Sequence, residues 1–552
     1  MSTLVAADRA VAATPERPRW RWTPAALTAA VVVPIVVAVV RAVHERWFPV
    51  GDSALLYVRA RDVLTADHPW LGSWTSASLS IGHDVNNPGP LYSDLIAPFG
   101  RLLHGGAGAA IGVGLVNFLA VIGISVAARH VGGWRMQRVM LVATAALVWT
   151  MGSWLLVDIW QPHALLLPFV LLLVLLLGIA LERWRCVPWA VTIGSIVVQT
   201  HIAYAYALAA LTAVTVVILA VRRGSLRGLP WRPSLTGRQA RWSYGGFLVL
   251  WSQPIIEQLF GSGEGNLARL ATGASGGGLK VGVRDATRLT AAVMFQAPWQ
   301  LQSGFTTAVP RTPLTQTAAG PTLVIAGIHR FVIAAAILVV IIGVLVALAV
   351  AHRRADDVLL ATACWFAAAS VVTGVVCVAV VTVGDVGLGQ HHVRWLWPLT
   401  IVVQTIGAWS VLELVGRRLR ARDTRRSLPR FAGGLTAVLT LVFAVVAVPA
   451  FAQPEGPTAD RDAMPALRQV FAQLDVLGSS SPVLFDLGNL VVYEPYSSAI
   501  MMRLQELGIS FRVTEASMVR QVGNRRASTG HERTTIFQLE HLDAVTYEGS
   551  AC

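Results

Sequence analysis

The hydrophobic positions of this chain gather in long apolar runs that are separated by shorter polar segments. Many of these runs hold about 20 residues, which is enough to cross the roughly 30 Å of hydrocarbon in a bilayer. The pattern predicts eleven membrane-spanning helices, at residues 23–43, 107–128, 139–156, 160–181, 187–201, 205–221, 243–260, 331–351, 357–382, 396–415 and 431–451. We therefore expect an α-helical polytopic membrane protein.

Two segments of the loop 44–106 are amphipathic. Residues 53–65 show helical spacing of their apolar side chains and also carry Arg59 and Arg61. Residues 91–103 are similarly short and have one apolar face. Both segments are too short to span a bilayer, so we expect two helices that lie in the plane of the membrane interface.

The tail at residues 453–552 has the pattern of a soluble domain. Short stretches have the residue types and alternation of strands, and one longer stretch has helical spacing. The predicted strands are 482–487, 510–514 and 534–538, and the predicted helix is 496–507. We expect a small α/β domain.

Composition agrees with a membrane protein. The chain has 552 residues, of which 55% are hydrophobic and 13% are charged, and a soluble protein of this length does not hide so much apolar surface. The net charge of +14 comes largely from arginines in short loops between apolar runs, which is a topology signal and not a nucleic-acid footprint. The four cysteines have neither metal-ligand nor disulfide spacing.

The arginine distribution also orients the chain, because loops rich in Arg stay on the cytoplasmic side. This rule places the N-terminal tail 1–23 in the cytoplasm and the loops 44–106 and 262–328 outside. The transmembrane domain is expected at 24–452, and the domain 453–552 is then extracytoplasmic. We expect the protein in the plasma membrane.

Asp52 is the first candidate for chemistry. It follows Gly51 at the point where the first predicted helix has left the membrane. A carboxylate at the edge of a low-dielectric cavity holds its proton more tightly, which suits a general base. The alternative is that Asp52 caps the interfacial helix that starts at Ser53.

Two further polar patches lie at predicted helix ends. Asp158 and His163 could join in a metal or phosphate site, with helix capping and ordinary hydrogen bonding as the alternatives. His201 ends another helix and has Gln199 and Tyr204 nearby. Polar groups are expensive to place in lipid, so this patch is expected to face a wet cavity or to bond within the bundle.

The fourth patch contains Arg394, which follows His391 and His392 at the outer mouth of the tenth predicted helix. Arginine keeps its charge and makes paired hydrogen bonds to phosphate. Because an outer arginine runs against the topology trend, we expect a phosphate partner, with interfacial anchoring as the alternative. All four patches fall on the same, outer side of the predicted topology.

The order of these patches resembles the C-type (GT-C) glycosyltransferase superfamily, nearest to the protein O-mannosyltransferases and lipid A aminoarabinose transferases. That family has an Asp-Glu pair in its first outer loop, followed by an amphipathic helix with a tyrosine. The matching pieces here are Gly51-Asp52-Ser53, Tyr57, Pro88-Gly89-Pro90-Leu91-Tyr92, Asp158 with Pro162, and Arg394-Trp395-Leu396-Trp397-Pro398. Two positions depart from the family, since Ser53 replaces the second acid and Trp395 replaces the usual tyrosine.

The resemblance implies a GT-C-like fold and a single inverting transfer of a sugar from a polyprenyl-phosphate donor to an acceptor hydroxyl on the outer face. By position, Asp52 would remove the acceptor proton, and Arg394, Arg59 and His392 would bind the donor phosphate. A divalent cation, if bound, would use Asp158 and His163. The remaining substrate contacts would come from Asp158, His163, His201, Tyr57 and Asn87.

The Ala-, Val- and Arg-rich composition is typical of GC-rich bacterial genomes. If that genome belongs to an organism with an arabinan- or mannan-containing envelope, we expect arabinofuranose or mannose as the sugar and an envelope glycan, lipid or protein as the acceptor. An alternative function is a transporter or flippase of a lipid-linked glycan, which would need the same phosphate site and no base. A membrane scaffold is a third possibility, although it would have no use for polar clusters near the membrane.

Overall fold

The computed structural model describes residues 24–78, 82–224, 235–261, 263–274, 279–295, 314–317, 320–323, 328, 330–383, 388–422, 428–451, 458–475, 482–487, 495–537 and 546–549. The predicted N-terminal tail 1–23 and a large part of the predicted outer loop 262–328 lie outside these ranges.

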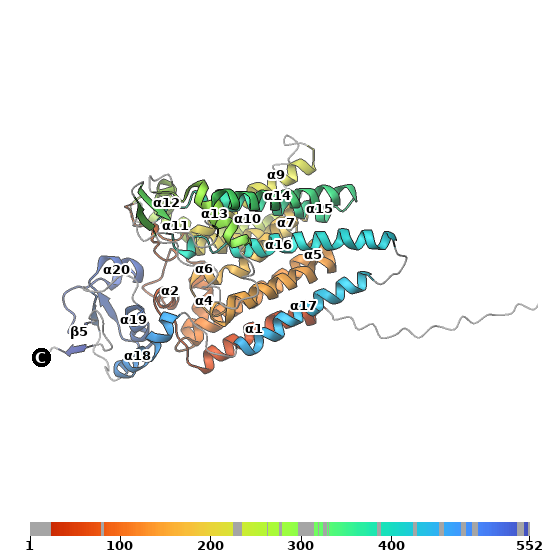
Figure 1. Ribbon diagram of the computed structural model, residues 1–552. Helices are drawn as coiled ribbons and strands as arrows, with labels where there is room; N and C mark the ends of the chain where they lie inside the picture. Colours follow the sequence, from red (N-terminus) through yellow and green to blue (C-terminus); the bar gives the residue numbers. More distant parts are fainter. Residues whose placement is uncertain are drawn as a thin grey trace, which may run out of the picture.

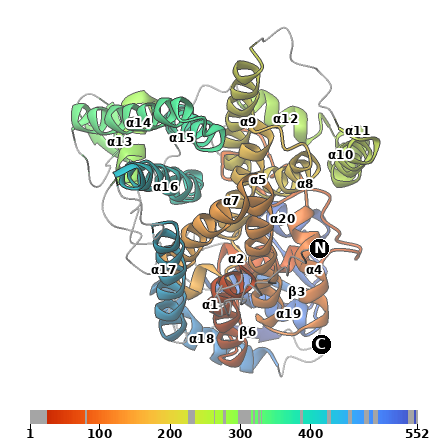
Figure 2. The same ribbon diagram turned by 90° about the vertical axis from the view of Figure 1, so that its right-hand side faces the viewer.

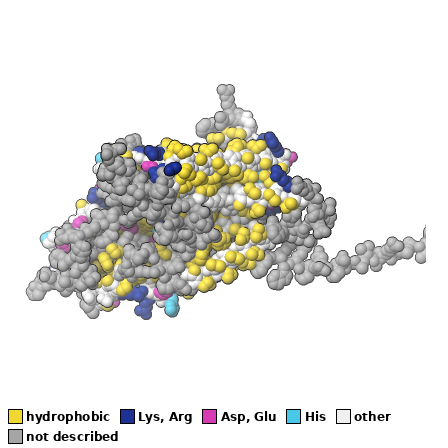
Figure 3. Space-filling view, viewed as in Figure 1, with side chains coloured by type: hydrophobic (Ala, Val, Ile, Leu, Met, Phe, Trp, Pro, Cys, Tyr) yellow, Lys and Arg dark blue, Asp and Glu magenta, His cyan; other side chains and the backbone are white. Residues whose placement is uncertain are grey.

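The apolar runs fold as helices that lie alongside one another (Figure 1). Figure 3 shows hydrophobic side chains over much of the described surface of this bundle, with Lys and Arg toward its ends. Among the described residues, seven helices are long and apolar enough to cross a membrane. They are α1 (Pro24–His44), α5 (Ala107–Leu155), α9 (Ile202–Arg222), α14 (Phe331–Arg354), α15 (Val358–Ala379), α16 (Leu396–Arg422) and α17 (Leu428–Phe451). The prediction of a polytopic helical membrane protein is confirmed.

Helix α5 is a hairpin of two helices and not one straight rod. The Asn117 side-chain amide donates to the Leu156 carbonyl over 3.0 Å, whereas a straight helix would separate these residues by about 58 Å. The chain reverses at Gly132 and Gly133, and Gly133 has φ 67° and ψ −160°, a conformation open essentially to glycine alone. The two predicted helices 107–128 and 139–156 are the two arms.

The other predicted spans also coincide with helices, some of them short or broken. The run 160–181 forms α6 (Gln161–Ala164) and α7 (Leu166–Ala180), and the run 187–201 forms α8 (Cys186–Thr200). The run 243–260 is divided at Trp251 into α10 (Gly237–Leu250) and α11 (Ser252–Phe260). Figure 2 shows α10 and α11 at the edge of the bundle, apart from α14–α16. The total of eleven spans stays a prediction.

The two amphipathic segments of the first loop are helices α2 (Asp52–Arg61) and α4 (Leu91–Leu102). Most of α2 is buried, because it packs between α4 and α19 (Tyr496–Glu506) of the C-terminal domain. We expected α2 to lie in the membrane interface and did not predict that the C-terminal domain covers it. An amphipathic pattern indicates one buried side without saying what covers it, and the sequence around α2 does not reveal a partner that follows more than 400 residues later.

The described part of the segment 262–328 is more regular than the outer loop that we expected. It contains α12 (Asn266–Ala274), α13 (Gly282–Phe295) and an antiparallel hairpin of β1 (Leu314–Thr317) and β2 (Gly320–Leu323). Helix α13 packs against α14, α15 and α16. The Gln404 side chain of α16 donates to the Met294 carbonyl of α13 over 2.6 Å.

The C-terminal domain contains a four-stranded sheet in the order β4-β3-β5-β6. Strand β3 (Val483–Asp486) runs parallel to β4 (Phe511–Val513) and β5 (Thr534–Phe537), while β6 (Thr546–Gly549) is antiparallel to β5. Helix α19 connects β3 to β4, as a parallel pair requires. The three predicted strands and the predicted helix are confirmed. The remaining helical elements are α18 (Thr458–Leu474), α20 (Ala516–Val522) and η4 (Asn524–Arg526).

The domain lies at the end of the bundle where α2 and α4 are found (Figure 1). Phe48, which precedes α2, packs against Phe471 of α18 with ring centroids 4.8 Å apart. The Arg468 guanidinium of the same helix donates to the Glu45 carbonyl over 2.9 Å. The first loop and the C-terminal domain therefore form one contiguous body at this end of the molecule.

Candidate active site

The Asp158 carboxylate lies at the centre of the polar groups that the fold brings together. It follows the second arm of α5 and is 3% exposed. Its Oδ1 accepts hydrogen bonds from the Ser53 hydroxyl at 2.7 Å and from the Trp160 backbone amide at 3.1 Å. Its Oδ2 lies 2.7 Å from Nδ1 of His163. The N-cap position of α6 is occupied by Trp160, so the capping alternative for Asp158 is wrong.

His163 lies in α6 and is buried beside Asp158. The carboxylate contact fixes the orientation of the ring through Nδ1. Nε2 is buried and has no hydrogen-bond partner within the part of the chain that the structure describes. The ring therefore retains one hydrogen-bonding group that the described residues do not use.

Asp52 is the first residue of α2, and Gly51, with φ 55°, occupies the N-cap position. The alternative in which Asp52 caps this helix is therefore wrong. The Asp52 side chain is exposed, although the protein around it is dense. Loss of hydration raises the pKa of its carboxyl, the nearby charge of Asp158 raises it further, and a hydrogen bond with the Trp160 side chain opposes the rise. Asp52 is thus an accessible carboxylate whose proton affinity is increased.

Aromatic and histidine rings lie beside the two carboxylates. The Trp160 ring meets His163 and His391 at centroid distances of 4.7 and 5.6 Å. His391 lies 4.0 Å from His392 and 6.1 Å from His201. Burial lowers the pKa of His391 well below its usual value and lowers that of His392 to about 4. Both imidazoles are therefore neutral at physiological pH.

His201 has a structural contact of its own. It stands between α8 and α9, and its Nδ1 accepts the Ala203 backbone amide at 3.3 Å as the N-cap of α9. The residue is buried. The structure thus favours the alternative of hydrogen bonding within the bundle for Nδ1, while the ring faces His391.

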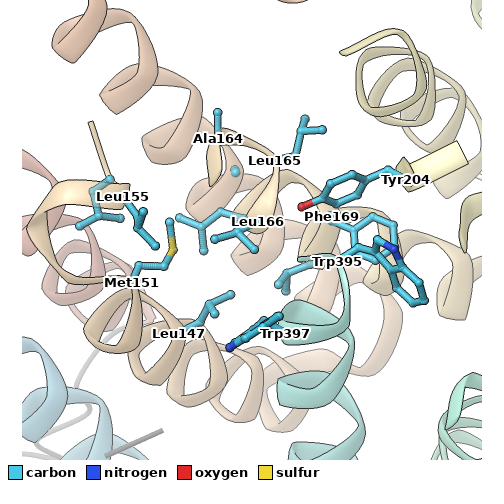
Figure 4. Close-up of a cluster of buried hydrophobic side chains, with 14 of the residues drawn as sticks. Leu147, Met151, Leu155, Ala164, Leu165, Leu166, Phe169, Tyr204, Trp395 and Trp397 are labelled. Atoms are coloured by element: carbon cyan, nitrogen blue, oxygen red, sulfur yellow. The ribbon is translucent and has the colours of Figure 1, made fainter. Parts of the chain in front are cut away.

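Arg394 is fully buried, at 0% exposure, and does not lie open at a helix mouth. Its guanidinium carbon lies 5.1 Å from the centre of the Trp397 ring. Figure 4 shows Trp395 on the side of Phe169 and Tyr204, and Trp397 on the side of Leu147. Burial lowers the pKa of Arg394 to about 10, against the opposing effects of Tyr204 and Asp158, so the side chain is positive at neutral pH.

The loop segments 72–78 and 82–89 are joined to these groups by side-chain amides. Gln161 donates to the Ser73 hydroxyl at 2.5 Å, and Asn87 donates to the same hydroxyl at 3.0 Å. The Asn87 oxygen accepts the Ile202 backbone amide, next to His201, at 2.9 Å. Asn87 is buried and holds this loop against the start of α9. Neither Ser73 nor Gln161 was identified from the sequence, because single polar residues in loops carry no spacing signal.

The structure does not bring Tyr57 and Arg59 to the Asp158 cluster. The Tyr57 hydroxyl donates to the Gly105 carbonyl at 3.0 Å, and its ring lies next to Gly100 of α4 and Gly108 of α5. The Arg59 guanidinium donates to Asp62 at 2.8 Å and to the Val522 carbonyl of the C-terminal domain at 3.0 Å. These contacts occupy the two side chains in packing and in domain contact, and we assign them no part in substrate binding.

The predicted cation site is not supported by the ligand geometry. Within the described ranges, no group of three or more His, Cys, Asp or Glu side chains could hold a metal ion. Both oxygens of Asp158 already accept hydrogen bonds. Cys186, Cys364 and Cys377 are buried free thiols. The described residues therefore do not offer the three ligands that a resident divalent cation would need.

The site contains three groups that can take part in a reaction. They are the accessible Asp52 carboxylate of raised pKa, the Asp158 carboxylate held by a hydroxyl and an imidazole, and the buried positive charge of Arg394. An accessible carboxylate of this kind can take a proton from a hydroxyl. A positive charge in a low-dielectric setting acts strongly on a nearby anion. The arrangement suits proton abstraction beside a negatively charged ligand.

Comparison with known proteins gives structural likeness only. No protein-family model and no curated protein matches the chain. The structure is similar to that of ArnT from Cupriavidus metallidurans bound to undecaprenyl phosphate, with 14% identity, 93% of this chain and 92% of that chain covered, and a TM-score of 0.48. It is also similar to the Archaeoglobus fulgidus oligosaccharyltransferase tethered to an acceptor peptide (12% identity, coverage 89% and 64%, TM-score 0.38). A further similar structure is AglB of the same organism with an inhibitory peptide and a dolichol-phosphate (12% identity, coverage 95% and 74%, TM-score 0.34).

Proposed function

We propose that this protein is an integral membrane glycosyltransferase that moves a sugar from a polyprenyl-phosphate donor to an acceptor hydroxyl. The observation that carries the proposal is the accessible Asp52 carboxylate of raised pKa beside Asp158. The seven described helices that are long and apolar enough to cross a membrane suit a donor that is carried by a lipid. The order of the Asp52, Asp158 and Arg394 motifs, which resembles that of C-type glycosyltransferases, supports the same reaction class.

The reaction is a single displacement in which Asp52 acts as the base. Its carboxylate takes the proton of the acceptor hydroxyl as the acceptor oxygen attacks the anomeric carbon. The new bond from carbon to the acceptor oxygen forms while the bond from carbon to the phosphate oxygen breaks. The electron pair leaves with the lipid phosphate, and the configuration at the anomeric carbon inverts.

Arg394 stabilises the leaving phosphate through its charge. The phosphate gains negative charge as the bond breaks, and a fixed positive charge in a buried setting favours that change more than it favours the bound donor. Asp158 and His163 act beside Asp52. Asp158 holds Ser53, the residue that follows Asp52, and His163 presents Nε2 to the sugar or the phosphate.

The sugar, the acceptor and the orientation also belong to this proposal. We propose arabinofuranose or mannose as the sugar and an envelope glycan, lipid or protein on the outer face as the acceptor. The protein would lie in the plasma membrane with a cytoplasmic N-terminus and an extracytoplasmic C-terminal domain, because the positive-inside rule assigns the arginine-rich loops of the sequence to the cytoplasm and the site to the outer side.

The test is sugar transfer in nanodiscs from a panel of polyprenyl-phosphate sugars, with wild type beside Asp52→Asn. We expect Asp52→Asn to lose transfer by about 100-fold or more while it still binds the donor lipid, since general base catalysis contributes about 10²–10⁴-fold. Asp67→Asn, in the same loop, is the matched control and should transfer at the wild-type rate. Equal rates for wild type and Asp52→Asn would remove Asp52 as the base. Lipid binding without transfer by either protein would favour a carrier of lipid-linked glycans.

A further inference from the structure

A buried ion cluster joins helix α2 to the C-terminal domain. Asp62 follows the last residue of α2 and is 2% exposed. Arg526 of η4 donates to both of its carboxylate oxygens, each at 2.7 Å. Arg59 donates to Oδ2 at 2.8 Å, and Gln505 of α19 donates to Oδ1 at 2.7 Å. One carboxylate thus receives four hydrogen bonds from three side chains, two of which belong to the C-terminal domain.

The geometry of this cluster is stiff. A guanidinium that meets a carboxylate through two parallel bonds fixes direction as well as distance. Arg526 is itself 8% exposed, and its guanidinium carbon lies 4.6 Å from the centre of the Phe511 ring. A buried ion pair is a poor source of net stability, and its best-attested role is to fix one arrangement among several.

The same interface contains a second Arg–Asp pair that lacks these properties. Arg520 of α20 lies 3.0 Å from Asp84, and the two side chains are 40% and 41% exposed. An ion pair that is open to water contributes little and tolerates movement. Of these two ion pairs, the buried pair Asp62–Arg526 is the one that restricts the position of α2 against the domain.

The C-terminal domain also contacts the other end of α2. The Gly51 backbone amide, one residue before Asp52, donates to the Pro495 carbonyl at the start of α19 over 3.2 Å. Helix α2 has 10 residues and is about 15 Å long, with a hydrogen bond at every turn. The domain therefore holds both ends of the short helix whose first residue is Asp52.

We propose that Asp62 and Arg526 are positioning residues, through which the C-terminal domain holds α2 so that Asp52 stays beside Asp158. The domain is then part of the catalytic unit. This inference rests on the proposed function in so far as Asp52 is the base. The positioning itself is a structural property that an assay independent of transfer can detect.

The experiment compares Arg526→Gln, Arg526→Lys and the matched control Arg520→Gln in the full-length protein in nanodiscs. We expect Arg526→Gln to lower kcat by about tenfold to 100-fold, because a displacement of about 1 Å at a reacting group costs about 100-fold. The KM for the donor should stay within about twofold, since the donor site is not touched. Arg526→Lys keeps the charge but loses the paired geometry, so its kcat should lie between those of wild type and Arg526→Gln. The kcat of Arg520→Gln should match that of wild type.

Two further measurements separate positioning from general damage. Hydrogen exchange of the backbone amides of α2 should become faster in Arg526→Gln and stay unchanged in Arg520→Gln. The pH at which kcat falls should move toward the ordinary pKa of an aspartate, because Asp52 moves away from Asp158 and becomes better hydrated. If Arg526→Gln does not fold, the same two measurements are made on Arg526→Lys.

The outcomes separate this inference from the proposed function. Wild-type kcat and wild-type exchange in Arg526→Gln would overturn the positioning role. A fall in kcat that is equal in Arg526→Gln and Arg520→Gln would overturn it as well. If wild type transfers no sugar but α2 exchanges faster in Arg526→Gln alone, the proposed function fails and the positioning of α2 by the domain stands.

Discussion

The Ser53 hydroxyl donates a hydrogen bond to Oδ1 of Asp158 over 2.7 Å, inside the protein. Glycosyltransferases that this chain resembles have a second acid at the position of Ser53. A glutamate here would bring another negative charge against the buried Asp158 carboxylate, at a high cost in free energy. A neutral donor satisfies the carboxylate instead, and Asp52 is then the accessible acid that lies beside Asp158.

Replacement of Ser53 by Ala should lower the free energy of unfolding by about 1.5–3 kcal/mol, the range for hydrogen bonds to charged groups. Denaturant titration of the purified protein measures the change. Ser53→Thr keeps the hydroxyl, so its free energy of unfolding should fall less than that of Ser53→Ala. The free energy of unfolding of Ser53→Glu should fall more than that of Ser53→Ala. A Ser53→Ala variant as stable as wild type would show that the hydrogen bond to Asp158 makes no net contribution.

Replacement of Gly133 by Ala should destabilise the α5 hairpin. Gly133 has φ 67° and ψ −160°, and open space surrounds the place where a Cβ would lie. The cost is then one of backbone conformation alone, about 1–3 kcal/mol. Thermal unfolding in detergent should show a lower midpoint.

Gly343→Ala is the matched control for the hairpin turn. Gly343 lies inside α14, and the place where its Cβ would lie is also surrounded by open space. Alanine favours a helix over glycine, so this variant should keep or slightly raise the unfolding midpoint. Equal midpoints for the two variants would contradict the strained turn at Gly133.

The membrane helices were predictable because apolar runs of sufficient length have few alternatives to a helix in lipid. The hairpin inside α5 was predictable for the same reason, since two runs flank the polar segment around Gly132 and Gly133. The strands of the C-terminal domain follow from local alternation. Cover of α2 by that domain could not be predicted, because Asp62 and Arg526 are 464 residues apart.

The site shows the same division between local and distant information. Asp52, Asp158 and Arg394 were found as polar groups at helix ends. The hydrogen bond from Ser53 to Asp158 was missed, because Ser53 lies 105 residues earlier and has an ordinary local context. Tyr57 was assigned to the site although five residues turn an α-helix by about 140° from Asp52, which directs its side chain toward α4 and α5.

The pH dependence of kcat should report the pKa of Asp52. A base works only when it has lost its proton, so activity should fall as the pH falls through that pKa. Because burial and Asp158 raise the pKa of Asp52, the fall should begin above the ordinary range of an aspartate, which is near 4. The measurement is a profile of kcat against pH with saturating donor.

Two variants should move this profile in opposite directions. Trp160→Phe removes a hydrogen bond that lowers the pKa of Asp52, so activity should fall at a higher pH than in wild type. Asp158→Asn removes a negative neighbour that raises the same pKa, so its residual activity should persist to a lower pH. Shifts of the same sign in both variants would exclude Asp52 as the group that titrates.

Arg394→Gln should weaken binding of the donor lipid. A hydrogen bond or close contact with a charged partner contributes about 1.5–3 kcal/mol, which corresponds to a rise in Kd of about 10- to 150-fold. Arg394→Lys should be intermediate, because it keeps a positive charge without the planar fork of donors. Binding of donor lipid to the protein in nanodiscs provides the measurement.

The control for Arg394 is Arg288→Gln on α13. Arg288 is also largely buried, with a side chain 14% exposed and 2.9 Å from Asp285, but it lies outside the site. The loss of the Arg288 side chain should leave the Kd for the donor lipid unchanged.

The pKa of Arg394 is about 10, so the affinity of wild type for the donor should be constant near neutral pH. It should weaken as the pH rises past about 10 and the positive charge is lost. Unaltered donor affinity in Arg394→Gln, or an equal loss in both variants, would remove Arg394 from the phosphate site.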